Sequence, residues 1–200
     1  MTEDAVGPAF YFDLFSPEAY LAAERVLQTL PVATEWIPVA ALGLPAADTL
    51  QGFRCETDRE AYFDRIARVA ERRGLQPLRP PQLFPFDSLF AMRVATYAKQ
   101  IGRTVPFALA AFRQAFAGGR DLSVPDNVLI AAAACEMHPN AVTKGAALRS
   151  VAAALDDATA LAARRGVRDV PAVWVPGGEV FHGDEALEQA AQALVARRPP

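Results

Sequence analysis

The chain has 200 residues, of which 52% are hydrophobic and 22% are charged, and its net charge is −3. This composition is typical of a globular protein with a full core, and it indicates no basic surface for nucleic acid. No apolar run reaches the roughly 20 residues of a membrane span, and the acidic start Met1–Asp4 does not resemble a signal peptide. We therefore expect a cytoplasmic protein without a nucleic-acid or membrane partner.

The first forty residues predict a strand, a helix and a second strand. The apolar run Ala9–Leu14 is typical of a buried strand. A helix is expected over Pro17–Leu30, because apolar residues recur there at helical spacing and Pro31 ends the pattern. Thr34–Val39 follows as the second strand. A helix between two strands favours a parallel pair.

The middle of the chain, from about Thr57 to Met137, predicts helices and no strand. The helix starts and stops are marked by capping residues and glycines. The proline-rich segment Pro77–Pro85 predicts a loop. The expected helices run from Thr57 or Asp58 to Arg73, from Asp87 or Ser88 to Ile101, from Thr104 to about Ala117, and from Asp126 to near His138 and Pro139.

The last third returns to mixed structure. A helix is expected from Leu148 to Arg165, then a strand over Val170–Val175, a hairpin turn at 176–178, a return strand over Glu179–Phe181 and a final helix. The order β-α-β, helices, α-β-β-α predicts an α/β thioredoxin fold with an all-helical insertion. We place the thioredoxin-like domain at 1–42 and 148–200 and the inserted helical domain at 43–147.

The two cysteines, Cys55 and Cys135, lie far apart in the sequence. They form no Cys-x-x-Cys motif, and two histidines are too few for a histidine-based metal site. We expect two reduced thiols and no bound metal.

Ser16 lies at the junction between the first strand and the first helix, with Pro17 in the first helical position. One interpretation is a helix cap, in which the side chain accepts a backbone N–H. The other is a hydroxyl that donates a hydrogen bond to a bound thiolate and lowers the pKa of that thiol. No base partner marks Ser16 as a nucleophile.

Val170 and Pro171 open the third predicted strand. A proline at this place is expected to be cis in a thioredoxin-like order, which would turn the Val170 backbone outward beside Ser16. Those groups could pair with a cysteine-containing peptide as an added strand does. The alternative is an ordinary edge proline.

Asp184 and Glu185 begin the final helix. Acidic residues in this position can simply complement the helix dipole. Alternatively, one of them receives the α-amino group of a γ-glutamyl ligand. His182 is interpreted as a strand-end residue, and Asp87-Ser88 as a cap that could also line a substrate pocket.

The segment Phe12-Asp13-Leu14-Phe15-Ser16-Pro17-x-x-Tyr20-Leu21 resembles the opening of 2-hydroxychromene-2-carboxylate isomerases, which with kappa-class glutathione transferases form part of the DsbA-like branch of thioredoxin folds. Further similar segments are spread over nearly the whole chain: Trp36-x-Pro38-Val39, Phe84-Pro85-Phe86-Asp87-Ser88-Leu89, Asp121-Leu122-Ser123, Gly166–Ala172 and Phe181–Leu187.

This resemblance implies a glutathione-dependent isomerase of aromatic catabolism that acts on a small aromatic molecule. Ser16 would stabilise the glutathione thiolate, and Val170 and Pro171 would bind the cysteine backbone of glutathione. Asp184 and Glu185 would face the γ-glutamyl end. The resemblance also implies a homodimer.

The chain departs from the family pattern in several places, among them the mostly apolar segment Ala40–Phe53, and two single positions matter most for the site. Glu18 stands where the family has tyrosine, and Ala186 stands where it has arginine. If a thiolate binds at Ser16, the Glu18 carboxylate must point away from it or be protonated. A non-catalytic thioredoxin-like binding protein, or a DsbA-family protein of other activity without the Cys-x-x-Cys motif, therefore remains an alternative. Thiol–disulfide exchange is not favoured, because neither cysteine lies at the turn.

Overall fold

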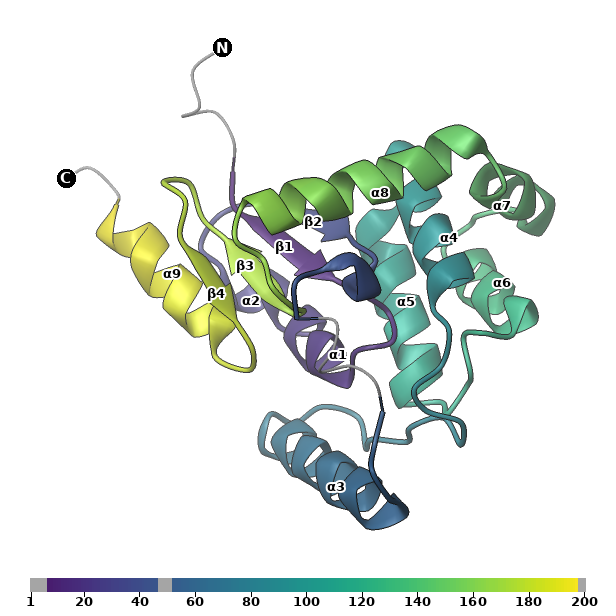
Figure 1. Ribbon diagram of the computed structural model, residues 1–200, viewed down its shortest axis with the longest axis horizontal. Coiled ribbons are helices and arrows are strands. Elements are labelled where there is room, and N and C mark those ends of the chain that lie inside the picture. Colours follow the sequence, from purple (N-terminus) through teal and green to yellow (C-terminus); the bar gives the residue numbers. More distant parts are fainter. Residues whose placement is uncertain (1–6, 47–51, 198–200) are drawn as a thin grey trace.

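The computed structural model describes residues 7–46 and 52–197. A four-stranded sheet forms its centre, in the order β2-β1-β3-β4 (Figure 1). The strands are β1 (Ala9–Phe12), β2 (Glu35–Pro38), β3 (Ala172–Trp174) and β4 (Val180–His182). β1 pairs in parallel with β2 and antiparallel with β3, and β3 pairs antiparallel with β4. The parallel β1–β2 pair is as predicted.

Two helices from the last third of the chain pack on the sheet and complete its core. α8 (Arg149–Arg164) packs on β2, and α9 (Ala186–Ala196) packs on β3 and β4. In Figure 1, α8 runs across the sheet and α9 lies beyond β4 at the opposite side from the helical part. All four residues of β1 are buried, which explains why this strand has no alternating polar residues.

Between β2 and α8 the described residues form only helices and loops. These helices are η2 (Ala41–Gly43, a 3₁₀ turn), α3 (Glu56–Arg72), α4 (Leu89–Gln100), α5 (Thr104–Phe116), α6 (Pro125–Ala133) and α7 (Pro139–Ala146). α4 packs on α5 and α7 but also on α8 and β2, so the helical part and the sheet share one core. The division of the chain at 42/43 and 147/148 therefore stays a prediction.

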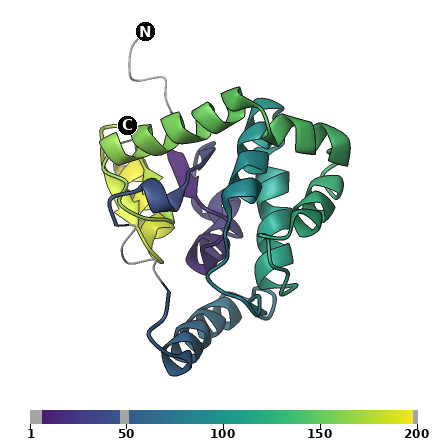
Figure 2. The ribbon, with the colours of Figure 1, turned by 45° about the vertical axis from the view of Figure 1, so that its right-hand side comes forward.

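The helix α3 occupies a separate place in the fold. Figures 1 and 2 both show it below the rest of the molecule, where it reaches back toward the start of the first helix. α3 packs on that helix, α1 (Pro17–Ala23). The position of α3 matters for the site described below, because α1 carries Ser16 at its N-terminus.

The prediction of one helix over Pro17–Leu30 is wrong in detail. The helix is interrupted after Ala23, and a short second helix, α2, spans Val26–Thr29. The Arg25 N–H bonds to the carbonyl of Ala22, three residues back, so the chain tightens at this point. The apolar spacing continues through the break, which is why the pattern alone did not reveal it.

The helix α7 was missed by the sequence analysis. Pro139 was interpreted as the end of the preceding helix, but it is the first residue of a new one. The Nδ1 atom of His138 accepts a hydrogen bond from the Asn140 N–H at 3.3 Å and so caps this helix. Proline is common both in the first turn of a helix and just after the end of a helix. Pro139 alone therefore could not distinguish the two interpretations.

Candidate functional site

Ser16 is the N-cap residue of α1, as the first interpretation predicted. Its Oγ accepts a hydrogen bond from the Ala19 N–H at 3.1 Å, and only 4% of the residue is exposed. A serine hydroxyl that accepts a backbone N–H keeps its own proton to donate. Within the described residues this hydroxyl donates to no protein group.

The predicted neighbours of Ser16 do meet it. Ser16, Val170 and Pro171 line one cavity of about 270 Å³. Phe15, Pro17, Glu18, Tyr62, Asp169 and Gly183 complete its lining. The fold brings these residues together from the β1–α1 turn, from the start of α1 and the middle of α3, from the loop before β3, and from the turn after β4. We call this cavity the Ser16 cleft.

The peptide bond between Val170 and Pro171 is cis, as predicted. The Pro171 carbonyl accepts a hydrogen bond from the Gly183 N–H at 3.1 Å. This bond links the residue before β3 to the residue after β4. By contrast, no hydrogen bond forms to the N–H or the C=O of Val170 within residues 7–46 and 52–197. Val170 thus offers one donor and one acceptor at the cleft, the pair that an extended peptide segment requires.

Glu18 lies in the same cleft, and α3 supplies its partners. The Tyr62 hydroxyl donates a hydrogen bond to Glu18 Oε2 at 2.5 Å, and Arg65 Nη2 lies 3.2 Å from Glu18 Oε1. Burial and the neighbouring Glu18 charge raise the pKa of Tyr62, so the phenol keeps its proton. The Glu18 charge is therefore held by two donors from α3.

Asp184 and Glu185 follow Gly183 in the sequence, are exposed, and do not themselves line the Ser16 cleft. Arg73 Nη1 is 2.6 Å from Asp184 Oδ1, a close ion pair without hydrogen-bond alignment, and Arg73 Nη2 donates to the Asp184 carbonyl at 3.3 Å. Glu185 is the exposed N-cap residue of α9, and its side chain makes no capping bond. Arg73 was not identified from the sequence, because nothing local links α3 to α9.

His182 ends β4, as expected from the sequence. Its Nε2 accepts the Arg168 N–H at 3.1 Å and lies 3.8 Å from Asp169 Oδ1. Burial lowers the pKa of His182, so the neutral ring is favoured at neutral pH. Nε2 is the ring nitrogen that could accept a proton as a base, and it already accepts a hydrogen bond from the loop before Val170.

Tyr62 of the Ser16 cleft and Asp13 of the β1–α1 turn gave little signal in the sequence. Tyr62 belongs to a helix whose apolar face predicts only core packing. Asp13 stands in an apolar run, which was interpreted as a buried strand. Its carboxylate accepts the Phe15 N–H at 3.2 Å and the Ala41 N–H at 2.9 Å, and only 2% of the residue is exposed. A charged residue inside a strand-like apolar segment is the signal that could have identified it.

Neither cysteine lines the Ser16 cleft. Cys55 is exposed before α3, and Cys135 is buried after α6. Burial raises the pKa of the Cys135 thiol, which makes it a weaker nucleophile. Among the residues described, no group of three or more His, Cys, Asp or Glu side chains could hold a metal ion. No helix in the described part of the chain is long and apolar enough to cross a bilayer.

The DSBA-like thioredoxin domain family matches residues 9–195. The match spans nearly the whole chain, from β1 to the end of α9. The protein therefore belongs to the DSBA-like thioredoxin domain family, as the sequence analysis expected, and its fold is the α/β thioredoxin fold with helices between the second and third strands. A search of curated proteins found no match.

Solved structures of three kinds share this fold. A 2-hydroxychromene-2-carboxylate isomerase is 20% identical, with a TM-score of 0.76 and 94% of each chain covered. A probable DsbA oxidoreductase from Streptomyces coelicolor is 18% identical, with a TM-score of 0.75, and 96% of this chain and 91% of that chain covered. The cytosolic disulfide reductase DsbM from Pseudomonas aeruginosa, solved with GSH, is 14% identical, with a TM-score of 0.69 and coverage of 96% and 98%. At these identities the similarity extends to the fold alone.

Proposed function

We propose that the protein is a glutathione-dependent isomerase of the 2-hydroxychromene-2-carboxylate type, in which Ser16 stabilises the glutathione thiolate. The observation that carries the proposal is the free donor of Ser16. Its oxygen already accepts the Ala19 N–H, so its proton remains to donate into the cleft. A hydrogen bond to an ionised sulfur favours the thiolate and lowers the pKa of the thiol.

The backbone of Val170 would hold the cysteine residue of glutathione. Its N–H and C=O lack partners within the described residues, and Val170 lines the same cleft as Ser16. Two backbone hydrogen bonds of this kind position a peptide without reading its side chain. The sulfur of the bound cysteine would then lie toward Ser16.

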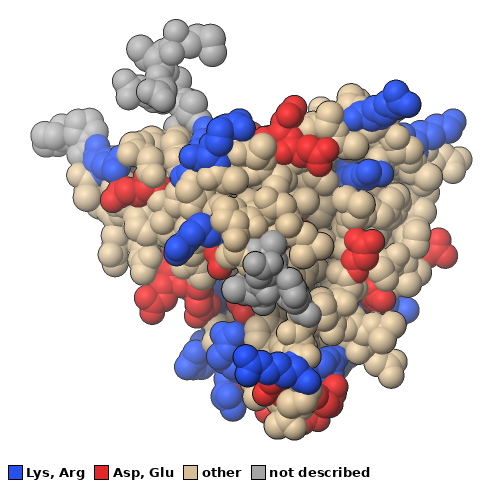
Figure 3. All heavy atoms as spheres, viewed as in Figure 1, with Lys and Arg blue, Asp and Glu red and all other residues tan. Residues whose placement is uncertain are grey.

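The charged residues of α3 and of the segment after Gly183 suit the ends of glutathione. Arg73 pairs with Asp184, so an incoming α-ammonium group could share Asp184 while the adjacent α-carboxylate contacts Arg73. Arg65, eight residues before Arg73, contacts Glu18. Figure 3 shows basic side chains (blue) over α3, with acidic ones (red) among them. Glu185 is exposed and is assigned a weaker part in this contact.

The proposed reaction needs no net redox change. The thiolate sulfur forms a bond to a conjugated carbon of the ring-opened substrate, and the displaced π electrons move to its carbonyl group. The former double bond can then rotate as a single bond. When the electrons return, the carbon–sulfur bond breaks and the thiolate is released unchanged. A serine at the turn suffices, because no disulfide forms.

Calorimetric titration with glutathione tests the proposal. We expect binding at millimolar affinity or better, and weaker binding of S-methylglutathione, which cannot form a thiolate. Ser16→Ala should bring the two ligands to similar affinities. Absence of glutathione binding by the folded wild-type protein would contradict the proposal.

A second candidate is a binding protein without catalytic activity. Two carboxylates, Glu18 and Asp169, line the cleft, and this favours a cationic or neutral peptide over an anionic thiol. Such a protein would bind an extended peptide through Val170 and would not bind glutathione. A competition titration with a cysteine-free peptide distinguishes the two candidates.

We also propose that the protein is a homodimer in the cytoplasm, as the family resemblance implies. Light scattering measures the oligomeric state directly. A monomer at all accessible concentrations would contradict this part of the proposal.

A further inference from the structure

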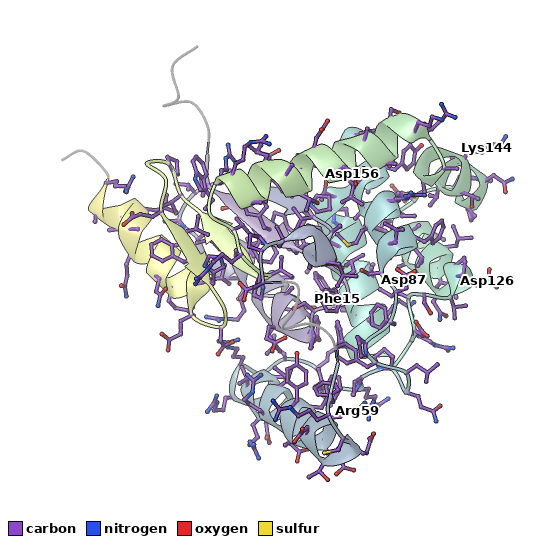
Figure 4. The ribbon with its side chains drawn as sticks, in the orientation of Figure 1. Phe15, Arg59, Asp87, Asp126, Lys144 and Asp156 are labelled. Atoms are coloured by element: carbon purple, nitrogen blue, oxygen red, sulfur yellow. The ribbon has the colours of Figure 1, made fainter. Side chains whose placement is uncertain are left out.

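A second and larger cavity lies next to the Ser16 cleft. Its volume is about 410 Å³, within the range of roughly 300–1,000 Å³ that is typical of small-molecule sites. It is enclosed by the β1–α1 turn, by η2, and by the start of α4. Phe15 lines both cavities, so a ligand here would lie beside a thiol held at Ser16. Figure 4 labels Phe15 at the centre of the molecule and Asp87 near the start of α4.

The lining of this cavity is mostly apolar but contains two carboxyl groups. The apolar members are Phe15, Ala40, Ala41, Leu42, Pro85, Phe86, Leu89 and Met92. The polar members are Asp13, Asp87 and Ser88. No lysine, arginine or histidine belongs to the described lining, and Arg93, next to Met92 on α4, is not part of it. The cavity therefore combines negative charge with an apolar wall.

Asp13 is the buried member of this set. Two backbone N–H groups, those of Phe15 and Ala41, donate to its two oxygens. A carboxylate has about four lone-pair sites, so it can accept further bonds. Burial raises the pKa of Asp13 to about 6. The opposing effects, which lower this pKa, all come from hydrogen-bond donors, among them the Ser88 side chain. No cation among the described residues acts on the pKa of this carboxyl group.

Asp87 is the other titratable group in the described lining. It is exposed, and its Oδ1 accepts the Leu89 N–H at 2.8 Å. Water therefore screens its charge, unlike that of Asp13. The η2 turn and the lining part of α4 contribute no ionisable side chain.

We propose that this cavity binds an uncharged aromatic ring bearing a hydroxyl group, which donates a hydrogen bond to Asp13, and that it rejects rings that carry a carboxylate. The apolar wall accommodates the ring, and the unused acceptor sites of Asp13 receive the hydroxyl proton. A carboxylate in the same place would meet a like charge in a region of low dielectric, with no compensating cation.

The contact with Phe15 gives this site a part in catalysis, and that part rests on the proposed function. The hydroxyl-bearing ring end of the substrate would occupy the cavity lined by Asp13, and the substrate's carboxylate would stay outside this cavity. The conjugated carbon would then reach the sulfur in the Ser16 cleft. Ligand binding in the cavity itself does not depend on glutathione. The two claims can thus fail separately.

The test uses three ligands of similar size: 2-naphthol, naphthalene and 2-naphthoate. At about pH 8 we expect 2-naphthol to bind the wild-type protein best, and 2-naphthoate to bind at least about tenfold more weakly than 2-naphthol, because Asp13 is ionised. At about pH 5 the gap between 2-naphthol and 2-naphthoate should narrow, because Asp13 is then mostly protonated.

Two variants locate the ligand and the charge. Ala40→Phe should fill the cavity and abolish 2-naphthol binding, while Ala134→Phe, on the exposed end of α6, should not. Asp13→Asn should remove the preference for 2-naphthol over 2-naphthoate, while Asp126→Asn, exposed at the start of α6, should retain it. If Asp13→Asn fails to fold, the pH comparison on the wild-type protein still decides the question.

The proposal is overturned if 2-naphthoate binds as tightly as 2-naphthol at about pH 8, if the gap is the same at about pH 5, or if no ligand of the series binds. Survival of 2-naphthol binding in Ala40→Phe also overturns it. A separate glutathione titration keeps the claims apart. Ligand preference without glutathione binding would support this site and contradict the proposed function.

Discussion

The Tyr62 hydroxyl donates a hydrogen bond to the Glu18 carboxylate at 2.5 Å, across the Ser16 cleft. Arg65 contacts the other oxygen of Glu18 from the same helix. From the sequence, the Glu18 carboxylate was expected to point away from a bound thiolate or to be protonated. The structure offers a third arrangement, in which α3 provides two donors that hold the charge. Glu18 thereby becomes the attachment point between α1 and α3.

Replacing Tyr62 by phenylalanine should lower stability. The variant removes a donor from a charged acceptor, and we expect a loss of about 1 kcal/mol after allowance for partial exposure. Urea unfolding measures the change. Tyr97→Phe is the matched control, since the Tyr97 hydroxyl makes no hydrogen bond to any described residue, and it should leave stability almost unchanged. Equal losses in the two variants would contradict the assignment.

Ser16 contributes to folding separately from any chemistry. Ser16→Ala removes the acceptor of the Ala19 N–H and should destabilise the protein by about 1 kcal/mol. Ser16→Asn retains a capping oxygen and should lose less. Chemical denaturation of the three proteins gives the comparison. If Ser16→Ala were as stable as the wild type, the N-cap would not contribute to stability.

The sequence was sufficient to predict the centre of the site. Ser16 was identified from a strand-to-helix junction with proline after it, and Val170-Pro171 from a proline that opens the third strand. Each motif has a set place in the order of elements, so the fold class alone implies that they meet. The family match then confirms the fold class on which that inference depends.

The partners of the site could not be predicted in the same way. Tyr62 and Arg65 belong to α3, and Arg73 is its C-cap residue. The spacing of this helix indicates only an amphipathic surface. The long loops on either side of α3 determine where this helix packs. The path of a loop leaves no periodic signal in the sequence. Asp13 was concealed because its neighbours are apolar, so the run predicted a buried strand without indicating a buried charge.

The burial of Asp13 predicts an unusual dependence of stability on pH. Its pKa is raised from 3.8 to about 6 in the folded state. The native protein therefore binds more protons at this site than the unfolded chain between these values, so the contribution of Asp13 to stability rises as pH falls from about 6 to about 4. A shift of this size corresponds to about 3 kcal/mol.

The stability difference between wild type and Asp13→Asn measures this effect. Asparagine does not titrate, so the contributions of other carboxyl groups cancel in the difference. The difference should move in favour of the wild type as pH falls from about 7 to about 4. A difference that stays constant over this range would show that Asp13 titrates normally.

The two cysteines should differ strongly in reactivity. Cys55 is exposed, while Cys135 is buried and burial raises the pKa of its thiol. A thiol reagent should modify Cys55 under native conditions and Cys135 only after denaturation. Mass spectrometry of timed samples, with Cys55→Ser as the control, identifies the modified residue. Rapid native labelling of Cys135 would contradict its burial.

The most direct test of the central claim is the pKa of the glutathione thiol when bound to the protein. Thiolate ultraviolet absorbance, followed as a function of pH, gives this value for the wild type, and Ser16→Ala provides the comparison. We expect the wild-type protein to lower the pKa of the bound thiol well below that of free glutathione. In Ser16→Ala the pKa of the bound thiol should return most of the way to the value of free glutathione. A bound thiol with the same pKa in both proteins would contradict the role assigned to Ser16.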